Sequence, residues 1–452
     1  MVFGRLIRAL DRPLDAASCA AFRLMFGALL VLSTVRFVAH GWVAEYYRSP
    51  QLFFHYWGFS WIRPWPGIGM YLHYGVLCVA AGFILLGVGY RVACAVFALG
   101  FGYAHFCDKA TYLNHYYLIT LLTGLCACLP LDRQWSLRVR RKPGDRRGQV
   151  RAWALYLLRF QISIVYLFGG IAKLNGDWLV YGQPLRIWLA ADADLPLIGG
   201  ILGRAGAGLA FSWAGALFDL SIVPLLSFRK TRAAAYVALI VFHVLTALLF
   251  HIGMFPWIMI LSATLFFEPS WPRDLLRRWG GKRGLVLSVV TPGIAGDVLG
   301  PKARLMAAAY ALVQVGLPLR SALYPGNTLW TEEGFRFAWR VMLIEKSASL
   351  EFKVVDDQGH RYYVAPSDYL TPFQTRMAST QPDMILELAQ AIAADFRRRG
   401  HSGVRVYADS EVSFNGRLRQ RMIDPEVDLA EQRDSLAPKR WILPAPRGAP
   451  LF

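Results

Sequence analysis

The chain has 452 residues and a mass of 50.8 kDa; 55% of its residues are hydrophobic, 14% are aromatic and only 17% are charged. A soluble globular chain carries about 25% charged residues, so the composition excludes an ordinary soluble enzyme as well as a disordered or fibrous protein. The mean hydropathy of +0.35 and the 15 tryptophans indicate a polytopic membrane protein with wide membrane–water interfaces, where tryptophan and tyrosine are enriched.

The net charge of +19 is confined to one part of the chain. Residues 326–452 hold 17 basic and 17 acidic side chains, so residues 1–325 carry the whole basic excess. A basic excess in the loops between apolar segments indicates membrane topology and not nucleic-acid binding. We therefore predict a transmembrane helical catalytic domain over 1–325, an extramembrane α/β domain over 326–452, and no nucleic-acid partner.

Apolar segments follow one another along the first of these domains, and about nine of them approach the roughly 20 residues that span a bilayer. We predict membrane spans at residues 16–38, 69–88, 92–107, 112–130, 152–174, 208–228, 233–252, 253–267 and 304–323. The predicted fold class is thus a polytopic α-helical membrane protein with a C-terminal α/β domain outside the membrane.

The basic loops indicate how the spans are oriented. Arginine and lysine cluster at residues 5–12, 133–151, 229–232 and 277–283. With nine spans and a cytoplasmic N-terminus, all four clusters lie on the same side, as the positive-inside rule requires. We therefore predict a multi-pass protein of the cell inner membrane with a periplasmic C-terminal domain, in which the first span acts as an uncleaved signal anchor.

The C-terminal domain alternates between strand and helix patterns. Residues 349–357 and 361–366 predict a β-hairpin around Gln358-Gly359. Residues 382–400 have helical periodicity and end at a glycine, and residues 404–416 alternate as a strand does.

Cysteine and histidine spacing predicts no metal site. All six cysteines lie in or beside the first four predicted spans, where we expect them to be small core residues, and Cys126-Ala127-Cys128 lacks the spacing of a zinc or redox pair. His243 and His251 are eight residues apart and point about 80° apart on a helix. No carboxylate or cysteine completes a ligand set around them.

Ionisable side chains inside membrane spans are costly, so each is a candidate functional group. Lys173 ends the fifth predicted span, one turn after Gly169-Gly170, and Asn114-His115 begins the fourth. With the predicted topology both positions lie at the external ends of adjacent spans, so that His115 and Lys173 can meet at a similar depth. Burial would disfavour the ammonium form of Lys173 and favour the neutral amine, which can act as a base.

Structural explanations also remain open for these side chains. Lys173 can extend along its span toward the membrane surface, and His115 can be a hydrogen-bonded histidine of the bundle. Two further span residues, Arg23 and Arg159, are expected to pair with backbone carbonyls or with Asp219.

Several motifs, taken together, resemble the vitamin K-dependent gamma-glutamyl carboxylase family, in its bacterial branch, which is an HTTM-domain family. The similarity is spread over most of the chain and lies in Asp108-Lys109, Asn114-His115, Tyr117-Leu118, QISIVYLFGGIAKLNGDW (161–178), LFHIGMF (249–255), EPSWPR (268–273), Trp339 and VSFNGRLRQRMIDPEVDLA (412–430).

This resemblance implies a coupled reaction. A lysine deprotonates reduced vitamin K, whose oxygenation by molecular oxygen gives a strong base; that base removes a γ-proton from a peptide glutamate, carbon dioxide adds, and the quinone leaves as an epoxide. The family's lysine falls on Lys173, and its Asn-His pair falls on Asn114 and His115, which would position the hydroquinone oxyanion. The implied partners are a glutamate-containing peptide or protein, membrane lipid and quinone, with no metal. The residues assigned to cofactor binding are Tyr166, Gly169, Gly170, Trp178 and His243.

Two departures from the vertebrate pattern keep other functions open. Ala172 stands where vertebrate members have a second lysine, and an apolar run follows Trp339 where they have a histidine. The alternatives are a quinol epoxidase that does not carboxylate glutamate, and a non-catalytic membrane scaffold.

Overall fold

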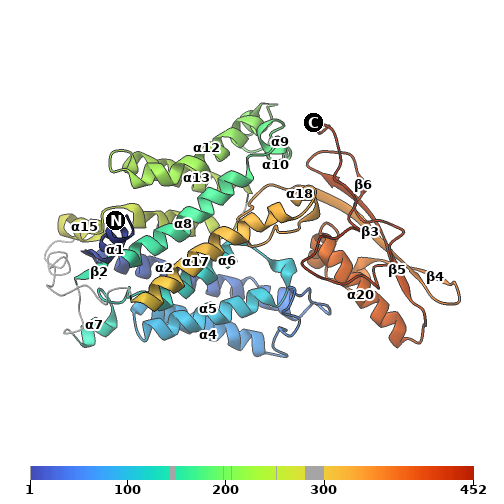
Figure 1. Ribbon diagram of the computed structural model, residues 1–452, viewed down its shortest axis with the longest axis horizontal. Coiled ribbons are helices and arrows are strands. Elements are labelled where there is room, and N and C mark those ends of the chain that lie inside the picture. Colours follow the sequence, from blue (N-terminus) through green and yellow to red (C-terminus); the bar gives the residue numbers. More distant parts are fainter. Residues whose placement is uncertain are drawn as a thin grey trace.

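The computed structural model describes residues 2–142, 148–196, 198–204, 206–250, 252–279 and 300–451 (Figure 1). Long helices run side by side along the molecule, and a part containing a β-sheet lies at one end, opposite the N-terminus. Below, these are the helical part and the strand domain.

Each of the nine predicted spans coincides with a helix. These helices are α2 (Ala17–Ala39), α4 (Gly69–Leu86), α5 (Tyr90–Phe106), α6 (Asn114–Cys128), α8 (Ala152–Ala172), α12 (Ala207–Ser227), α13 (Arg232–Phe250), α14 (Phe255–Ala263) and α17 (Pro301–Leu319). Among the described residues, six helices are long and apolar enough to cross a membrane, namely α2, α4, α8, α12, α13 and α17 with the turn that follows it. A polytopic helical membrane protein is thereby supported, while the count of nine spans stays a prediction.

Shorter elements connect these helices. They are α1 (Val2–Asp11), α3 (Trp42–Tyr47), α7 (Leu137–Arg141), α9 (Gly176–Leu179), α10 (Leu185–Ala191), α11 (Gly199–Leu202), α15 (Trp271–Trp279), α18 (Thr328–Thr331) and the 3-10 turn η1 (Lys109–Thr111). Two short strands, β1 (Pro13–Asp15) and β2 (Gln149–Arg151), pair antiparallel and tie the N-terminal segment to the start of α8.

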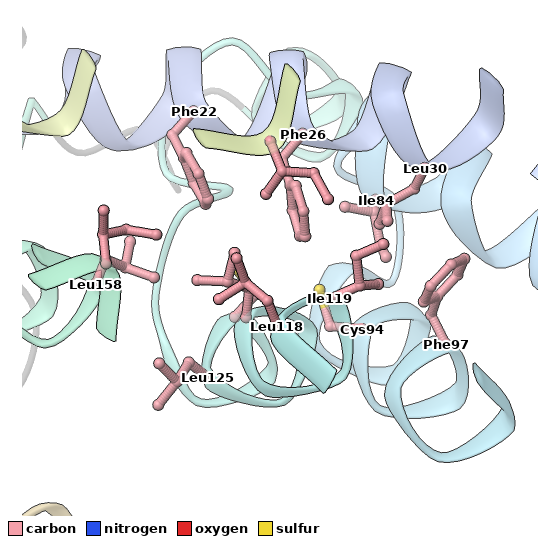
Figure 2. Close-up of a cluster of buried hydrophobic side chains, with 14 of the residues drawn as sticks. Phe22, Phe26, Leu30, Ile84, Cys94, Phe97, Leu118, Ile119, Leu125 and Leu158 are labelled. Carbon is pink, nitrogen blue, oxygen red and sulfur yellow. The ribbon is translucent and has the colours of Figure 1, made fainter. Parts of the chain in front are cut away.

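The core of the helical part is built from aromatic and branched side chains of several helices. Figure 2 shows Phe22 and Phe26 of α2 extending toward Leu118 and Ile119 of α6, with Cys94 of α5 beside them. Lipid tails are as apolar as these side chains, so close van der Waals packing, not exclusion of water, holds such helices together. Four of the six cysteines, Cys19, Cys94, Cys107 and Cys126, are buried, which confirms their predicted role as small core residues; Cys78 is half-buried, and for the exposed Cys128 the prediction is wrong.

Two arginines inside predicted spans pair with backbone carbonyls, as expected. Arg23 is 1% exposed and donates to the carbonyls of Ile84 at 3.0 Å, Leu131 at 3.2 Å and Trp135 at 2.6 Å. Arg159 donates to the carbonyls of Leu265 at 2.8 Å and Phe267 at 3.1 Å. The alternative expectation, that Asp219 is a partner of these arginines, is wrong, because Asp219 pairs with Lys173.

The strand domain confirms the elements predicted for the C-terminal residues. Its sheet has the order β4-β3-β5-β6, formed by β3 (Lys346–Val355), β4 (Arg361–Val364), β5 (Arg405–Phe414) and β6 (Gln420–Arg421), with helices α19 (Pro372–Ala378) and α20 (Pro382–Arg398). β3 and β4 form the predicted hairpin, in which Phe352 pairs with Val364. The apolar face of α20 is buried against the domain core through Met384, Ile385, Leu388, Ile392 and Phe396.

A buried lysine joins the strand domain to the helical part. Lys109 follows α5, is 3% exposed, and its Nζ lies 3.2 Å from Asp383 Oδ2 and 3.0 Å from Glu387 Oε2 of α20. Arg336 also pairs with Asp383, at 2.6 Å. Burial alone would raise the pKa of Asp383, but Arg336 and Lys109 outweigh it and hold this pKa well below its usual value.

Replacing Lys109 by methionine is expected to lower the free energy of unfolding by about 1.5–3 kcal/mol, because Asp383 keeps Arg336 but both Asp383 and Glu387 lose the charged hydrogen bond from the buried amine. Asp383 has a lowered pKa in the folded state, so its contribution is present above about pH 4 and is lost as the pH falls below that value. The difference between wild type and Lys109→Met in thermal unfolding should therefore be constant above pH 4 and shrink below it.

The control for this prediction is Arg398→Ala on the same helix. The side chain of Arg398 is 74% exposed and pairs with Asp395 at 2.9 Å, an ion pair of a kind that contributes about 1 kcal/mol or less. If both variants lost the same free energy of unfolding, the prediction that the buried ion pairs of Lys109 stabilise the protein more than an exposed ion pair would be wrong.

Candidate active site

Lys173 is held inside the helical part and does not extend to its surface. α8 ends at Ala172, and Lys173 follows as its C-terminal capping residue with 6% of its surface exposed. Its Nζ donates to Asp219 Oδ2 at 2.7 Å and to the carbonyl of Gly169 at 3.2 Å. The amine thus has one carboxylate and one carbonyl as fixed partners.

Asp219 is a site residue that the sequence analysis did not assign. It lies in the middle of α12 and is 9% exposed. A carboxylate in the middle of an apolar span indicates a functional residue with a cationic partner, because an unpaired carboxylate is costly in a membrane. The sequence alone did not indicate which cation that partner is.

The two glycines of α8 allow α12 to approach. A Cβ atom added to Gly170 would lie 2.7 Å from Leu220 Cδ2 and 3.2 Å from Asp219 Cβ, and one added to Gly169 would lie 3.4 Å from Asp219 Oδ2. Small residues at helix contacts permit this close packing in membranes. Gly169-Gly170 therefore sets the helix spacing that brings Asp219 to Lys173.

Replacing Gly170 by alanine is expected to destabilise the protein by about 1–3 kcal/mol and to reduce its activity, because the added methyl group forces Leu220 or the whole of α12 outward. Thermal unfolding and product formation should be measured on the same preparation. Gly82→Ala in α4 is the matched control: nothing lies within 4 Å of its added Cβ, so this change should be neutral or stabilising. A Gly170→Ala variant as stable and active as Gly82→Ala would contradict the close-approach role.

Lys173 and Asp219 lie at the edge of an apolar cavity of about 260 Å³. Three of the predicted cofactor-binding side chains, Tyr166, Trp178 and His243, line the same cavity, as does Gly169. The remaining walls are largely apolar and come from Val165, Leu185, Phe211, Ala214, Gly215, Phe242, Leu245, Thr246, Leu249, Phe250, Ile252, Phe255, Val341 and Met342. We call this space the Lys173 cavity.

Hydrogen bonds fix the polar side chains of this cavity. The Tyr166 hydroxyl lies 2.7 Å from His243 Nε2, and Trp178 Nε1 donates to the Ser212 carbonyl at 2.6 Å. The Lys173 amine lies 5.2 Å from the centre of the Trp178 ring, within the range of a cation–π contact. The second ring nitrogen of His243, Nδ1, is buried and has no hydrogen-bond partner in the described part of the chain.

The local fold explains the position of Trp178. Asn175 follows Lys173 closely, and its side-chain oxygen accepts from the backbone N–H of Trp178 at 3.0 Å, which caps the short helix α9. The chain therefore turns directly after Lys173 and folds Trp178 back over the amine.

The structure does not bring His115 to Lys173. His115 lines a second cavity, of about 350 Å³, between α2, α6 and α19, which we call the His115 cavity. Within the described residues, no hydrogen bond reaches either ring nitrogen of His115. The predicted bundle histidine with satisfied hydrogen bonds is thus not observed either.

The two cavities are neighbours. Ile252 lines both, and the ring of Phe255 lies 6.5 Å from the His115 ring and 6.1 Å from the His243 ring. The turn between α13 and α14 therefore forms the wall between them. Sequence spacing indicated the depth of each side chain but not the rotation of each helix, which decides the cavity that a side chain enters.

Asn114 supports the Lys173 cavity indirectly, by binding the backbone of a segment that is distant in the chain. Its side-chain amide donates to the Arg340 carbonyl at 2.9 Å, and its side-chain oxygen accepts from the Tyr112 hydroxyl at 3.1 Å. Arg340 precedes Val341 and Met342, which line the Lys173 cavity, so Asn114 holds one wall of that cavity.

No group of three or more histidine, cysteine, aspartate or glutamate side chains that could hold a metal ion occurs among the residues that the structure describes. His251, the second histidine considered in the sequence analysis, lies outside the described residues.

Comparison with family models defines the class of the protein. Residues 11–271, more than half of the chain, match the HTTM domain, so the chain is an HTTM-domain membrane protein. Residues 301–448 match the lumenal domain of vitamin K-dependent gamma-carboxylase, a match that includes α17 and the strand domain. The chain therefore belongs to the gamma-carboxylase family and carries a lumenal or extracytoplasmic domain. No solved structure matches it.

Proposed function

We propose that this protein is an integral membrane enzyme that couples the oxygenation of reduced vitamin K to the carboxylation of peptide glutamate. The observation that carries the proposal is the buried pair of Lys173 and Asp219, with 2.7 Å between Nζ and Oδ2, at the edge of an apolar cavity in a chain of this family.

The residues of the Lys173 cavity fit a flat, apolar quinol. Most of the wall is aliphatic or aromatic, which suits a ring system with a hydrocarbon tail. Two polar groups are available for the hydroxyl groups of the ring, namely the Lys173 amine and the unpartnered Nδ1 of His243. Tyr166 orients His243, and Trp178 offers an aromatic face.

The quinol, on reaction with molecular oxygen, supplies a base strong enough to remove the γ-proton of glutamate, to which carbon dioxide then adds. The protein must first accept the hydroxyl proton, and we assign this to Nζ of Lys173. Nζ is neutral when its own proton has moved to Asp219 Oδ2, a transfer over 2.7 Å between atoms that are already hydrogen bonded. Burial lowers the cost of this transfer, because two buried charges lose their hydration.

The remaining candidate residues act on the walls of the Lys173 cavity. The apolar lining excludes water, which would otherwise quench a strong base. Asn114 is proposed as a positioning residue for the Arg340–Met342 wall. His115 is proposed to support the turn at Gly253, because a Cβ atom added to Gly253 would lie 3.6 Å from the His115 ring.

Product analysis in nanodiscs tests the proposed function. The purified protein is given reduced vitamin K, oxygen, labelled bicarbonate and a glutamate-rich peptide, and epoxide and fixed label are measured separately. Formation of both products supports the coupled enzyme. Epoxide without label would favour a quinol epoxidase, and neither product together with no bound quinone would favour a scaffold.

We also propose the orientation of the chain. The boundary near residue 325, the inner membrane, the cytoplasmic N-terminus and the periplasmic strand domain rest on the basic loops of residues 1–325. A reporter fused after Phe452 should be active only outside the cytoplasm; activity of a cytoplasmic reporter at that position would contradict this orientation.

A further inference from the structure

The segment between α3 and α4 exposes a cluster of large apolar side chains. Residues 57–68, which we call the aromatic loop, contain a single charged side chain, that of Arg63. Five apolar side chains among these 12 residues are between 40% and 71% exposed. They are Trp57, Phe59, Trp61, Trp65 and Ile68. Exposed apolar side chains that gather in one place mark a surface that binds another protein or a membrane.

The aromatic loop is held in one conformation by α5 and by the core of the helical part. The Tyr103 hydroxyl donates to the Arg63 carbonyl at 2.6 Å, and the Trp65 ring stacks on the Tyr103 ring with 5.1 Å between the centroids. The backbone N–H of Ile62 donates to the Phe59 carbonyl at 3.0 Å, and the Ile62 side chain is buried in the core. The apolar side chains are therefore presented outward by a fixed loop.

The aromatic loop lies where a membrane span meets the strand domain. Two residues before the loop, the backbone N–H of His55 donates to Glu387 of α20 at 2.8 Å. Directly after the loop, α4 begins at Gly69 and is long and apolar enough to cross a membrane. The end of a membrane span lies in the headgroup layer of the bilayer, so the loop lies at the depth of that layer.

The exposed side chains of the loop continue onto an exposed apolar face of α4. At intervals of three or four residues along this helix, Leu72, Val76 and Val79 are more than half exposed. Ile68 precedes Leu72 by the same interval, so it lies on the same helix face. Lipid covers such a face of a membrane span, and the same lipid reaches the adjoining loop.

The composition of the loop suits the membrane–water interface. Tryptophan is enriched there, because its ring is apolar while its indole N–H can still bond to water. The chain has no acidic residue between Glu45 and Asp108, and the exposed Arg63 can pair with lipid phosphate. Water in this layer also satisfies the backbone of an irregular segment, which the hydrocarbon core does not.

We propose that the aromatic loop inserts its apolar side chains into the interfacial layer of the leaflet nearest to the strand domain, with membrane lipid as its partner. The loop is then an anchor, because the contact between His55 and Glu387 ties the strand domain to a segment that is held at the bilayer surface. This inference goes beyond the proposed function, since it involves neither the quinol nor the peptide.

Quenching of a fluorescent label tests the proposal in the full-length protein. Cys78 and Cys128 are first replaced by alanine, because the other four cysteines are buried. Trp61→Cys then carries the label, in nanodiscs that hold one copy of the protein each. Iodide is the quencher in water, and a lipid with a nitroxide near its headgroup is the quencher in the membrane. The label should be quenched by the nitroxide lipid and shielded from iodide.

Tyr363→Cys is the matched control. The exposed fraction of Tyr363 is 66%, close to the 71% of Trp61, but Tyr363 lies in β4, at the end of the strand domain away from the long helices (Figure 1). A label at Tyr363 should be quenched by iodide and not by the nitroxide lipid.

Three results would overturn the proposal. The first is equal access of iodide to the two labels. The second is a Trp61→Cys label that is shielded from both quenchers, because protein would then cover the loop. The third is shielding from iodide that appears only with two copies in one nanodisc, because the loop would then bind a second copy of the chain.

A second variant tests whether the apolar side chains hold the loop in the membrane. Trp57→Ser with Ile68→Ser changes exposed side chains only, so the fold should be retained, which thermal unfolding checks. The label at position 61 should then lose most of its quenching by the nitroxide lipid and become accessible to iodide. A folded variant whose label is quenched as before by both agents would contradict the anchoring role of these side chains, and with it the proposal.

Discussion

Replacing Lys173 by alanine is expected to reduce epoxide formation and label fixation together by at least about 10²-fold, because a positioned general base contributes about 10²- to 10⁴-fold to the rate. Both products depend on the same first proton transfer, so neither should survive alone. The measurement is single-preparation product analysis, with quinone binding followed in parallel to show that the variant is folded.

Lys302→Ala is the control for this prediction, since Lys302 is an exposed lysine of α17 and lines neither the Lys173 cavity nor the His115 cavity. It should retain wild-type rates. A stable Lys173→Ala protein that kept more than a tenth of the wild-type epoxidation rate would remove Lys173 from the role of base.

Replacing Asp219 by alanine is expected to lower the free energy of unfolding by about 3–5 kcal/mol and to reduce both products strongly. The change leaves the Lys173 ammonium buried without its carboxylate, and an unpaired buried charge is costly. It also removes the group that takes the proton from Nζ. Thermal unfolding and product analysis read out the two effects separately.

A double variant separates the structural role of Asp219 from its chemical role. Lys173→Met with Asp219→Leu replaces both charges by apolar groups, which is often neutral or stabilising for a buried pair. Stability should return to near that of wild type while activity stays absent. If the double variant were less stable than Asp219→Ala alone, the ion pair would not be the cause of the stability loss.

Most of the fold could be predicted from the sequence, because the patterns that indicate its helices and strands are local. Apolar segments of membrane length mark helices wherever they occur, and all nine predicted segments are helical. The hairpin of β3 and β4 followed from strand patterns on either side of Gln358-Gly359. The number of spans is harder to predict, since α6 and α14 are shorter than a bilayer is thick.

The candidate site could be predicted only in part, because the sequence does not fix how each helix is rotated against its neighbours. Lys173, predicted as the base, lines one cavity with Tyr166, Trp178 and His243, which were predicted to bind the cofactor. His115 enters a different cavity because a helix turns by about 100° per residue, and nothing local in the sequence fixes the rotation of α6 against α8. Asp219 could be recognised in the sequence as a charged residue inside a span. Its partner depends on how α12 packs against α8, which the sequence does not show.

The conformation of the Trp339–Met342 segment could not have been predicted. Positive φ angles are expected at glycine, and neither Trp339 nor Met342 carries a local signal for them. Contacts with α6, which is more than 200 residues away in the chain, impose this conformation.

The ion pairs between the helical part and α20 have a consequence for biosynthesis. His55 and Glu387, which are hydrogen bonded beside them, are 332 residues apart in the chain. At about 5–20 residues per second, the ribosome needs roughly 15 to 70 s to make the acidic partner after the early loop has emerged. During that interval Lys109 has neither of its carboxylates, so its ammonium group must stay in contact with water or with another molecule until α20 is made. Nascent chains released before α20 is made should accordingly be preferred targets of membrane quality control.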